Sequence, residues 1–198
     1  MNYIELNNQV IIRDENGKYQ LNKDKEALKS YLEDYIEPKM KKFDNLNDRL
    51  NYLVENDYYS KEILDLYDQY VIDVIYDFIR AKNFKFQSYM SASKFYQNYA
   101  LKSNDGEEIL ENYEDKVLIV ALTLGNGEPK LAKDIAEKLI NQEFQPATPT
   151  FLNAGRARGG KMVSCFLVNV EDSCEGISYA VSSANHLSKI GGGVALNL

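Results

Sequence analysis

The stretch that decides the fold of this chain is residues 144–197, FQPATPTFLNAGRARGGKMVSCFLVNVEDSCEGISYAVSSANHLSKIGGGVALN. Within it, residues 161–170 (KMVSCFLVNV) have the β-rich composition of a buried strand with apolar side chains on both faces. Residues 174–190 follow as a predicted helix that Asp172-Ser173 would cap, and residues 194–196 begin a second strand after a glycine turn. Strand, helix and strand in this order predict a βαβ unit.

The residues before this unit predict a mainly helical region. Residues 146–150 (PATPT) cannot form a helix interior, because proline lacks an N–H donor and constrains the residue before it. Upstream of them, apolar residues recur at the i, i+3, i+4 spacing of helices with one buried face. The helices expected on this basis cover residues 23–37, 43–54, 61–66, 71–80, 91–100, 115–124 and 129–141.

The predicted fold class is therefore mainly α, followed by the first strands and helix of an α/β core. At the beginning, residues 10–12 and 19–21 flank Asn16-Gly17 and predict a short hairpin, after which Asn22 would cap the first long helix. Further along, residues 125–127 (GNG) would end the helix before them, and Pro129 would open the next.

Composition excludes several classes of protein. The 198 residues are 44% hydrophobic and 27% charged, a globular balance. The formal charge of -7 disfavours a nucleic-acid-binding surface, which needs clustered Lys and Arg. The longest apolar run, residues 117–122, is too short to cross a membrane, and the first residues lack the features of a signal peptide. We therefore expect a cytoplasmic protein without a membrane anchor.

Tyrosine, cysteine and histidine usage narrows the chemistry further. The 15 tyrosines fall at helical spacing, which predicts rings that pack helices together with hydroxyls at the surface, rather than a redox relay. The two cysteines, Cys165 and Cys174, lie nine positions apart without CxxC spacing, and we expect neither a structural disulfide nor a zinc site. Cys174 is expected to be structural. The single histidine, His186, is expected to be partly buried and hydrogen-bonded.

Cys165 is the first candidate for chemistry. A lone cysteine in a strand is usually a small buried hydrophobe. Here, however, the buried-looking Ser164-Cys165 pair lies between Gly159-Gly160 and the triple glycine at residues 191–193. Because glycine loses the most freedom on folding, so many glycines suggest close approach of the backbone to a ligand beside a reactive thiol.

Thr148, Ser164 and Gly193 are candidates for binding that ligand. Each has an ordinary interpretation, as a turn residue, a polar strand residue and a tight-turn glycine. Together, two hydroxyls and a bare backbone can hold the phosphates and sugar of a nucleotide. A dinucleotide site is disfavoured, because the GGGVALN turn (residues 191–197) lacks the GxGxxG pattern and follows a helix rather than a strand.

Several runs of sequence carry a resemblance to a known family. They are YIELNN, KFDNLNDRLNYLVENDYY, FYQNYALK, QPATPTFLNAGR, VSCFL and LSKIGGGVALNL. With them the chain resembles, along its whole length, the large catalytic subunit of class I ribonucleotide reductase, specifically class Ib. The resemblance implies reduction of ribonucleoside diphosphates to deoxyribonucleoside diphosphates for DNA synthesis. It also implies three regions: a helical cap with a shortened cone-like hairpin (1–84), a second helical domain (85–161), and the start of a ten-stranded α/β barrel (162–198).

The same resemblance implies roles for particular residues. Cys165 would be one half of a redox-active dithiol that reduces the ribose, with its partner much later in the family's sequence. Thr148, Ser164, Cys165 and Gly193 would contact the nucleoside diphosphate. Asp172 would belong to the site for a nucleoside triphosphate effector, although it could equally cap a helix, a contribution of about 1 kcal/mol.

The resemblance also implies partners. A separate small subunit would supply a metal–tyrosyl radical, a thioredoxin- or glutaredoxin-like protein would reduce the dithiol, and this chain would hold no covalent cofactor or metal. Because the chain stops at Leu198, we expect it to be inactive by itself and to dock onto the remainder of the subunit, unless it is a shortened piece or the product of an interrupted gene. The alternatives are a nucleotide-binding regulatory or interaction module without catalysis, and a purely structural helical protein.

Overall fold

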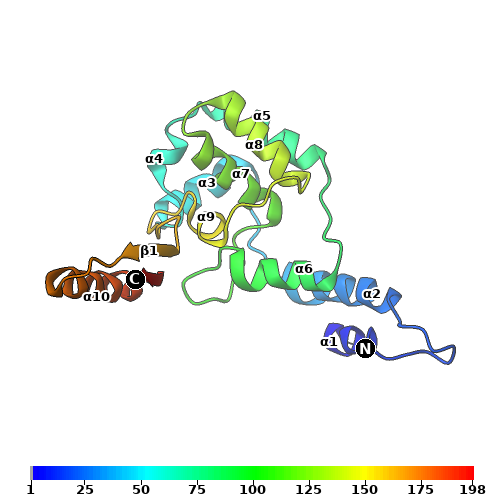
Figure 1. Ribbon diagram of the computed structural model, residues 1–198. Helices are drawn as coiled ribbons and strands as arrows, with labels where there is room; N and C mark the ends of the chain where they lie inside the picture. Colours follow the sequence, from blue (N-terminus) through cyan, green and yellow to red (C-terminus); the bar gives the residue numbers. More distant parts are fainter. Residues whose placement is uncertain (1) are drawn as a thin grey trace. The chain divides into compact units, whose positions relative to one another are not determined.

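The computed structural model describes residues 2–198, which fall into two compact units (Figure 1). The larger unit comprises the chain up to Gln145 together with the short segment Gly155–Arg158. The smaller unit comprises Pro146–Ala154 and Gly159–Leu198. The chain thus enters the smaller unit, returns to the larger one for four residues, and leaves it again.

The larger unit is helical. Its α-helices are α1 (Tyr3–Gln9), α2 (Asn22–Ser30), α3 (Leu46–Glu55), α4 (Lys61–Leu64), α5 (Gln69–Ala81), α6 (Tyr89–Lys94), α7 (Tyr113–Gly125) and α8 (Pro129–Ile140). Two of them continue into π-helical turns, η1 (Tyr31–Ile36) after α2 and η3 (Phe95–Tyr99) after α6, and a 3₁₀ turn, η2 (Glu37–Lys39), contains Pro38. The predicted helices are present at these places, with ends shifted by a few residues.

Helix α7 forms the centre of this unit, with α5 and α8 packed against it (Figure 1). Its apolar run, Val117 to Leu122, is fully or almost fully buried. Asn112 caps its first turn, where the side chain accepts from the backbone N–H of Asp115. The helix ends at the predicted glycine break. There Asn126 takes a left-handed conformation with φ 44°, and its backbone N–H donates to the carbonyl of Leu122, near the end of the helix.

The predicted N-terminal hairpin is only partly correct. Residues 10–21 form a turn closed by one antiparallel bridge, Arg13 with Tyr19, and no strand pair. Part of the reason is that helix α1, capped by Asn2, takes up the residues directly before it. The predicted cap at Asn22 is wrong, because Asn22 is already the first residue of α2 and Leu21 holds the cap position.

The tyrosines do pack helices together, but several hydroxyls are not at the surface. Tyr59, Tyr67 and Tyr76 are buried. Their hydroxyls donate to a carboxylate oxygen of Glu111 at 2.6 Å, to the carbonyl of Leu122 at 2.9 Å and to a carboxylate oxygen of Asp115 at 2.8 Å, respectively. The prediction failed because it ignored polar groups inside the core, which need buried donors.

The smaller unit contains α9 (Thr148–Asn153), β1 (Cys165–Asn169), α10 (Cys174–Lys189) and β2 (Gly193–Asn197). The strands β1 and β2 pair in parallel from Cys165 opposite Gly193 to Asn169 opposite Asn197, and α10 crosses between them. The predicted βαβ unit is therefore confirmed. The prediction of a buried strand is wrong for the residues described, since β1 is short and 82% of Leu167 is exposed.

Three other local predictions change in this unit. A short helix, α9, occupies part of the proline-rich run, which is possible because Pro149 lies in its first turn, where no donor is needed. Ser173, not Asp172, caps α10, since its hydroxyl accepts from the backbone N–H of Gly176 at 2.9 Å. His186 is exposed on α10 rather than partly buried.

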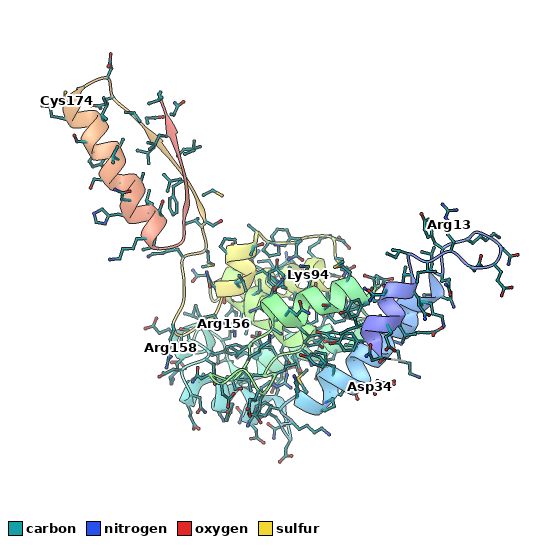
Figure 2. The ribbon with its side chains drawn as sticks, turned by 90° about the horizontal axis from the view of Figure 1, so that it is seen from below. Arg13, Asp34, Lys94, Arg156, Arg158 and Cys174 are labelled. Carbon is teal, nitrogen blue, oxygen red and sulfur yellow. The ribbon has the colours of Figure 1, made fainter. Side chains whose placement is uncertain are left out.

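Cys174 begins α10 and is exposed (Figure 2). Within residues 2–198, its side chain is therefore not part of a buried core, and the expected structural role as a core residue is not supported. Over the same residues, no helix has both the length and the apolar character needed to cross a bilayer.

Candidate functional site

A cleft of about 310 Å³ lies within the smaller unit. Three segments form its walls: helix α9, the run that leads into β1, and the glycine turn between α10 and β2. The lining residues are Thr148, Pro149, Leu152, Asn153, Gly160, Lys161, Val163, Ser164, Phe166, Ile190, Gly191 and Gly192. Segments that lie apart in the sequence thus meet at one cavity.

Hydrogen bonds between these segments hold the walls together. The side-chain amide of Asn153 donates to the carbonyl of Lys161 at 2.9 Å, which ties α9 to the run before β1. The backbone N–H of Gly193 donates to the carbonyl of Ser164 at 2.6 Å, which ties that run to the glycine turn. One side-chain bond and one backbone bond therefore connect the three walls of the cleft.

One glycine in the turn is required by packing. A Cβ on Gly192 would lie 2.4 Å from an atom of the Phe166 ring, well inside contact distance. The ring of Phe166 therefore packs against the backbone of Gly192, where a side chain would not fit. Gly191 has open space around the same position, but its φ of 87° favours glycine, so backbone conformation and packing explain part of the glycine enrichment without a ligand.

The structure brings four of the predicted site residues together. Thr148 and Ser164 line the cleft directly. Cys165 and Gly193 lie next to it and face each other in the register of β1 and β2. The hydroxyl oxygen of Ser164 lies 3.8 Å from the sulfur of Cys165, so hydroxyl and thiol occupy the same end of the strand.

The Ser164-Cys165 pair is exposed, which corrects its buried appearance in the sequence. Within residues 2–198, β1 has a single partner strand, and its side chains at Cys165, Leu167 and Asn169 are exposed. An accessible thiol is what reaction with a ligand or another thiol requires, whereas a structural cysteine is usually inert because it is buried.

Asp172 lies apart from these residues. It is exposed in the loop between β1 and α10, and it is absent from the lining of the cleft. The neighbouring Ser173 supplies the helix cap, so the capping interpretation of Asp172 is not supported. Any role for this carboxylate concerns a different site from the cleft.

Sequence reasoning missed three contributors to the cleft. Lys161 is the only charged side chain in the lining, and Asn153 and Phe166 shape it. The position of Lys161 directly after Gly159-Gly160 could have indicated its role, because a cation beside a pair of glycines can bind an anion. The signal for Phe166 was its place beside Cys165 on a predicted strand.

The combined lining suits a phosphorylated sugar. Two hydroxyls and an amide offer hydrogen bonds, Lys161 offers a positive charge, and Phe166 with Ile190 offers apolar surface for a flat group. Among residues 2–198, no group of three or more His, Cys, Asp or Glu side chains could hold a metal ion. The thiol of Cys165 is exposed and directly follows Ser164 in the sequence, although Cys165 itself is not part of the lining.

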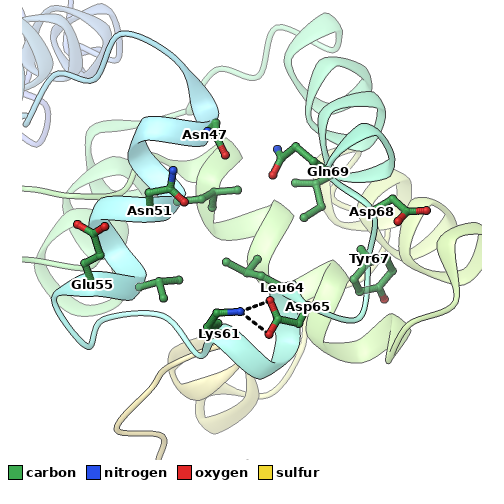
Figure 3. Close-up of a pocket in the computed structure, with 12 residues that line it drawn as sticks. Asn47, Asn51, Glu55, Lys61, Leu64, Asp65, Tyr67, Asp68 and Gln69 are labelled. Atoms are coloured by element: carbon green, nitrogen blue, oxygen red, sulfur yellow. Dashed lines mark hydrogen bonds and ion pairs between the residues drawn. The ribbon is translucent and has the colours of Figure 1, made fainter.

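One of the cavities of the larger unit, of about 510 Å³, lies between α3, α4 and the start of α5 (Figure 3). Its rim carries Glu55, Asp65 and Asp68, and its one cation, Lys61, is paired with Asp65 at 2.6 Å. The remaining charge is negative, which repels phosphate. Because it also lacks a nucleophile, we take the cleft beside Cys165 as the candidate site.

Three family models match consecutive parts of the chain. The description "Ribonucleotide reductase N-terminal" matches residues 3–84, "Ribonucleotide reductase, all-alpha domain" matches residues 85–159, and "Ribonucleotide reductase, barrel domain" matches residues 163–198. The cleft combines residues from the second and third of these segments.

Individual relatives agree with the family models. The chain is 53% identical over 196 residues to the ribonucleoside-diphosphate reductase subunit alpha of Bacillus subtilis, which covers 99% of this chain and 28% of the relative. A second Bacillus subtilis protein, the NrdEB subunit alpha, is 52% identical over 100% of this chain and 18% of its own length. The subunit alpha of Mycoplasma genitalium is 41% identical over 99% of this chain and 26% of its own length. The chain thus spans less than a third of these relatives.

Proposed function

Because this chain belongs to the ribonucleotide reductase family as part of the large subunit, we propose that its cleft forms one wall of the site that reduces ribonucleoside diphosphates. The observation that carries the proposal is the accessible thiol of Cys165 beside a cleft with hydroxyl, amide and cationic groups. The subunit is proposed to be of the class Ib form.

Cys165 supplies one of two thiols in this reaction. Two thiols release two electrons and two protons as they form a disulfide, and the ribose accepts them while its hydroxyl leaves as water. The carbon–oxygen bond is replaced by a carbon–hydrogen bond, so atoms and electrons balance. The second thiol comes from a cysteine of the large subunit outside residues 1–198, since Cys174 begins α10 at the far end of the crossover from the cleft.

The walls of the cleft hold the substrate. The hydroxyls of Thr148 and Ser164 bond to the sugar and phosphates, and the backbone at Gly193 allows close approach beside Cys165. Lys161 offsets the charge of the diphosphate, a role suited to the one cation in the lining.

Asp172 takes part in a separate effector site for a nucleoside triphosphate. Its support is the exposed position in the loop before α10, away from the cleft lining. The radical comes from a metal–tyrosyl centre in a small subunit, and a thioredoxin- or glutaredoxin-like protein restores the dithiol. The division at 84 and 161 into a helical cap, a second helical domain and the start of the barrel completes the proposal.

Replacing Cys165 by serine tests the redox assignment. In the complete reductase, Cys165→Ser is expected to abolish deoxyribonucleotide formation while nucleoside diphosphate binding, measured by calorimetry, stays unchanged. Removing one essential member of a catalytic group costs at least about 10³-fold in rate. The exposed Cys174 offers a matched control, and Cys174→Ser should leave the rate unchanged. Full activity of Cys165→Ser would favour a nucleotide-binding module without catalysis.

A further inference from the structure

The segment Gly155–Arg158 connects two walls of the cleft. Ala154, at its start, follows directly after α9 and Asn153. Gly159, at its end, leads through Lys161 to Ser164. The segment itself packs with the larger unit, whereas the residues on both sides of it belong to the smaller one. Its conformation therefore sets the separation of Ala154 and Gly159, the residues from which the two walls extend.

Backbone contacts hold this segment in place. The carbonyl of Gly155 accepts from the backbone N–H of Ser60 at 2.8 Å, and the N–H of Ala157 donates to the carbonyl of Tyr58 at 3.1 Å. Gly155 has φ 71°, and a Cβ there would lie 2.1 Å from a side-chain carbon of Ile119. The segment is thus pressed against helix α7 at a position that admits only glycine.

The side chain of Arg156 adds an ionic tie to the same place (Figure 2). Its guanidinium lies 3.0 Å from a carboxylate oxygen of Glu111, a residue with 0% exposure. The other carboxylate oxygen accepts from the hydroxyl of Tyr59 at 2.6 Å. The backbone N–H of Leu101 donates to Glu111 at 2.8 Å, and the ammonium of Lys116 lies 3.5 Å away.

Glu111 is held as an anion in this environment. Burial pushes its pKa upward, but Lys116 and Arg156 outweigh burial and hold the pKa below its ordinary value. A buried carboxylate with two cations keeps its geometry, because any movement leaves a charge without its partner in a medium of low dielectric. The tie therefore restricts the movement of the Arg156 side chain.

We infer that Arg156, fixed by Glu111, is a positioning residue for the nucleotide cleft. The Glu111–Arg156 pair sets the conformation of the segment Gly155–Arg158, from which both α9 with Thr148 and the run with Ser164 extend. Neither residue lines the cleft or touches a substrate there. The inference rests on the proposed function, since it assigns the pair to the positioning of the same nucleotide-binding walls.

Two matched substitutions test this inference in the complete reductase. Arg156→Met removes the tie from the segment but leaves Glu111 with Lys116, Tyr59 and Leu101. Lys116→Met removes the other cation of the same carboxylate and leaves the tie intact. We expect Arg156→Met to raise KM for the nucleoside diphosphate about tenfold, with a smaller change in kcat, because small misplacements of binding groups are costly. Lys116→Met should lower the melting temperature without changing KM.

The outcomes separate this inference from the proposed function. If the nucleoside diphosphate binds at this cleft, Thr148→Val and Ser164→Ala should lower its affinity for the reductase. If both variants keep the affinity of the unsubstituted reductase, the proposed function fails. If binding there is present but Arg156→Met keeps the original KM, or Lys116→Met raises KM equally, the positioning role is wrong. Arg156→Lys, which keeps a cation beside Glu111, should give an intermediate KM. An unchanged KM in that variant would overturn the role even where Arg156→Met does not fold.

Discussion

At the scale of single residues, two charged environments set the properties of this chain. Around Glu111, a carboxylate is buried with two cations, and around Asp115 a second carboxylate pairs with Arg49 and accepts from Tyr76. Around Cys165, by contrast, the thiol is exposed and its neighbour is a hydroxyl. Buried charges serve the architecture here, whereas the exposed thiol is the group that we propose for the chemistry.

The buried pair predicts a specific dependence of stability on pH. Since the folded pKa of Glu111 lies below the unfolded value of about 4.3, its ionised form stabilises the fold above that value and this contribution is lost as the pH falls through the folded pKa. Glu111→Gln should lower the free energy of unfolding by about 3–5 kcal/mol at neutral pH, because two cations lose their partner.

Urea unfolding at several pH values checks this prediction. Between about pH 5 and pH 3, the free energy of unfolding of the unsubstituted chain should fall more steeply than that of Glu111→Gln. Glu107→Gln is a control, since that neighbouring side chain is exposed. Parallel curves for the unsubstituted chain and Glu111→Gln would contradict the ionised state assigned to Glu111.

At the scale of elements, caps and glycines decide where each helix and strand begins. Helix α10 is capped by Ser173, although Asp172 is an equally good capping residue by type. The difference is one of position. The hydroxyl of Ser173 reaches the N–H of Gly176, three residues on, which is the geometry that an N-cap requires.

Substitution separates the two roles proposed for this pair. Ser173→Ala should destabilise the first turn of α10 by about 1 kcal/mol, seen as faster amide exchange at residues 175–177. Asp172→Ala should leave that exchange unchanged and instead weaken binding of a nucleoside triphosphate effector. Faster exchange in Asp172→Ala and not in Ser173→Ala would reverse the assignment of the cap.

At the scale of the whole molecule, the two units differ in how they are stabilised. In the larger unit, helices surround α7, and most residues of α7 are buried. The smaller unit has a two-stranded sheet, one crossover helix, and Ala180 as the only fully buried side chain of that helix among the residues described. Isolated two-stranded sheets are marginal in water, so the units should differ in local stability.

Hydrogen exchange of the 198-residue chain measures this difference. Amides of α7 should exchange only through global unfolding, whereas amides of β1 and β2 should exchange faster by orders of magnitude through local opening. When the chain is part of the complete reductase, protection of the two strands should rise, because further strands of the barrel would cover their edges. Equal protection of α7 and β1 in the isolated chain would contradict the prediction.

Much of this architecture could be predicted from local sequence. Helices α5, α7 and α8 were evident because their apolar spacing, caps and glycine or proline boundaries act within a few residues. The βαβ unit was evident for the same reason. The hairpin near Gly17 was overpredicted, and the exposure of Ser164 and Cys165 was missed, because neither depends on local pattern alone.

By itself, the sequence determined most of the helices, both strands, the family, and the residues that could carry chemistry, because propensity, capping and motif spacing are properties of neighbouring residues. It did not predict the short helices α1 and α9. Only the tertiary structure decided that Lys161 lines the cleft beside Ser164 and that Arg156 is tied to Glu111, 45 positions away. The physical reason is that charge pairing and cavity shape depend on distances in space. Folding brings these residues together, and their separation in sequence does not predict that they will be in contact.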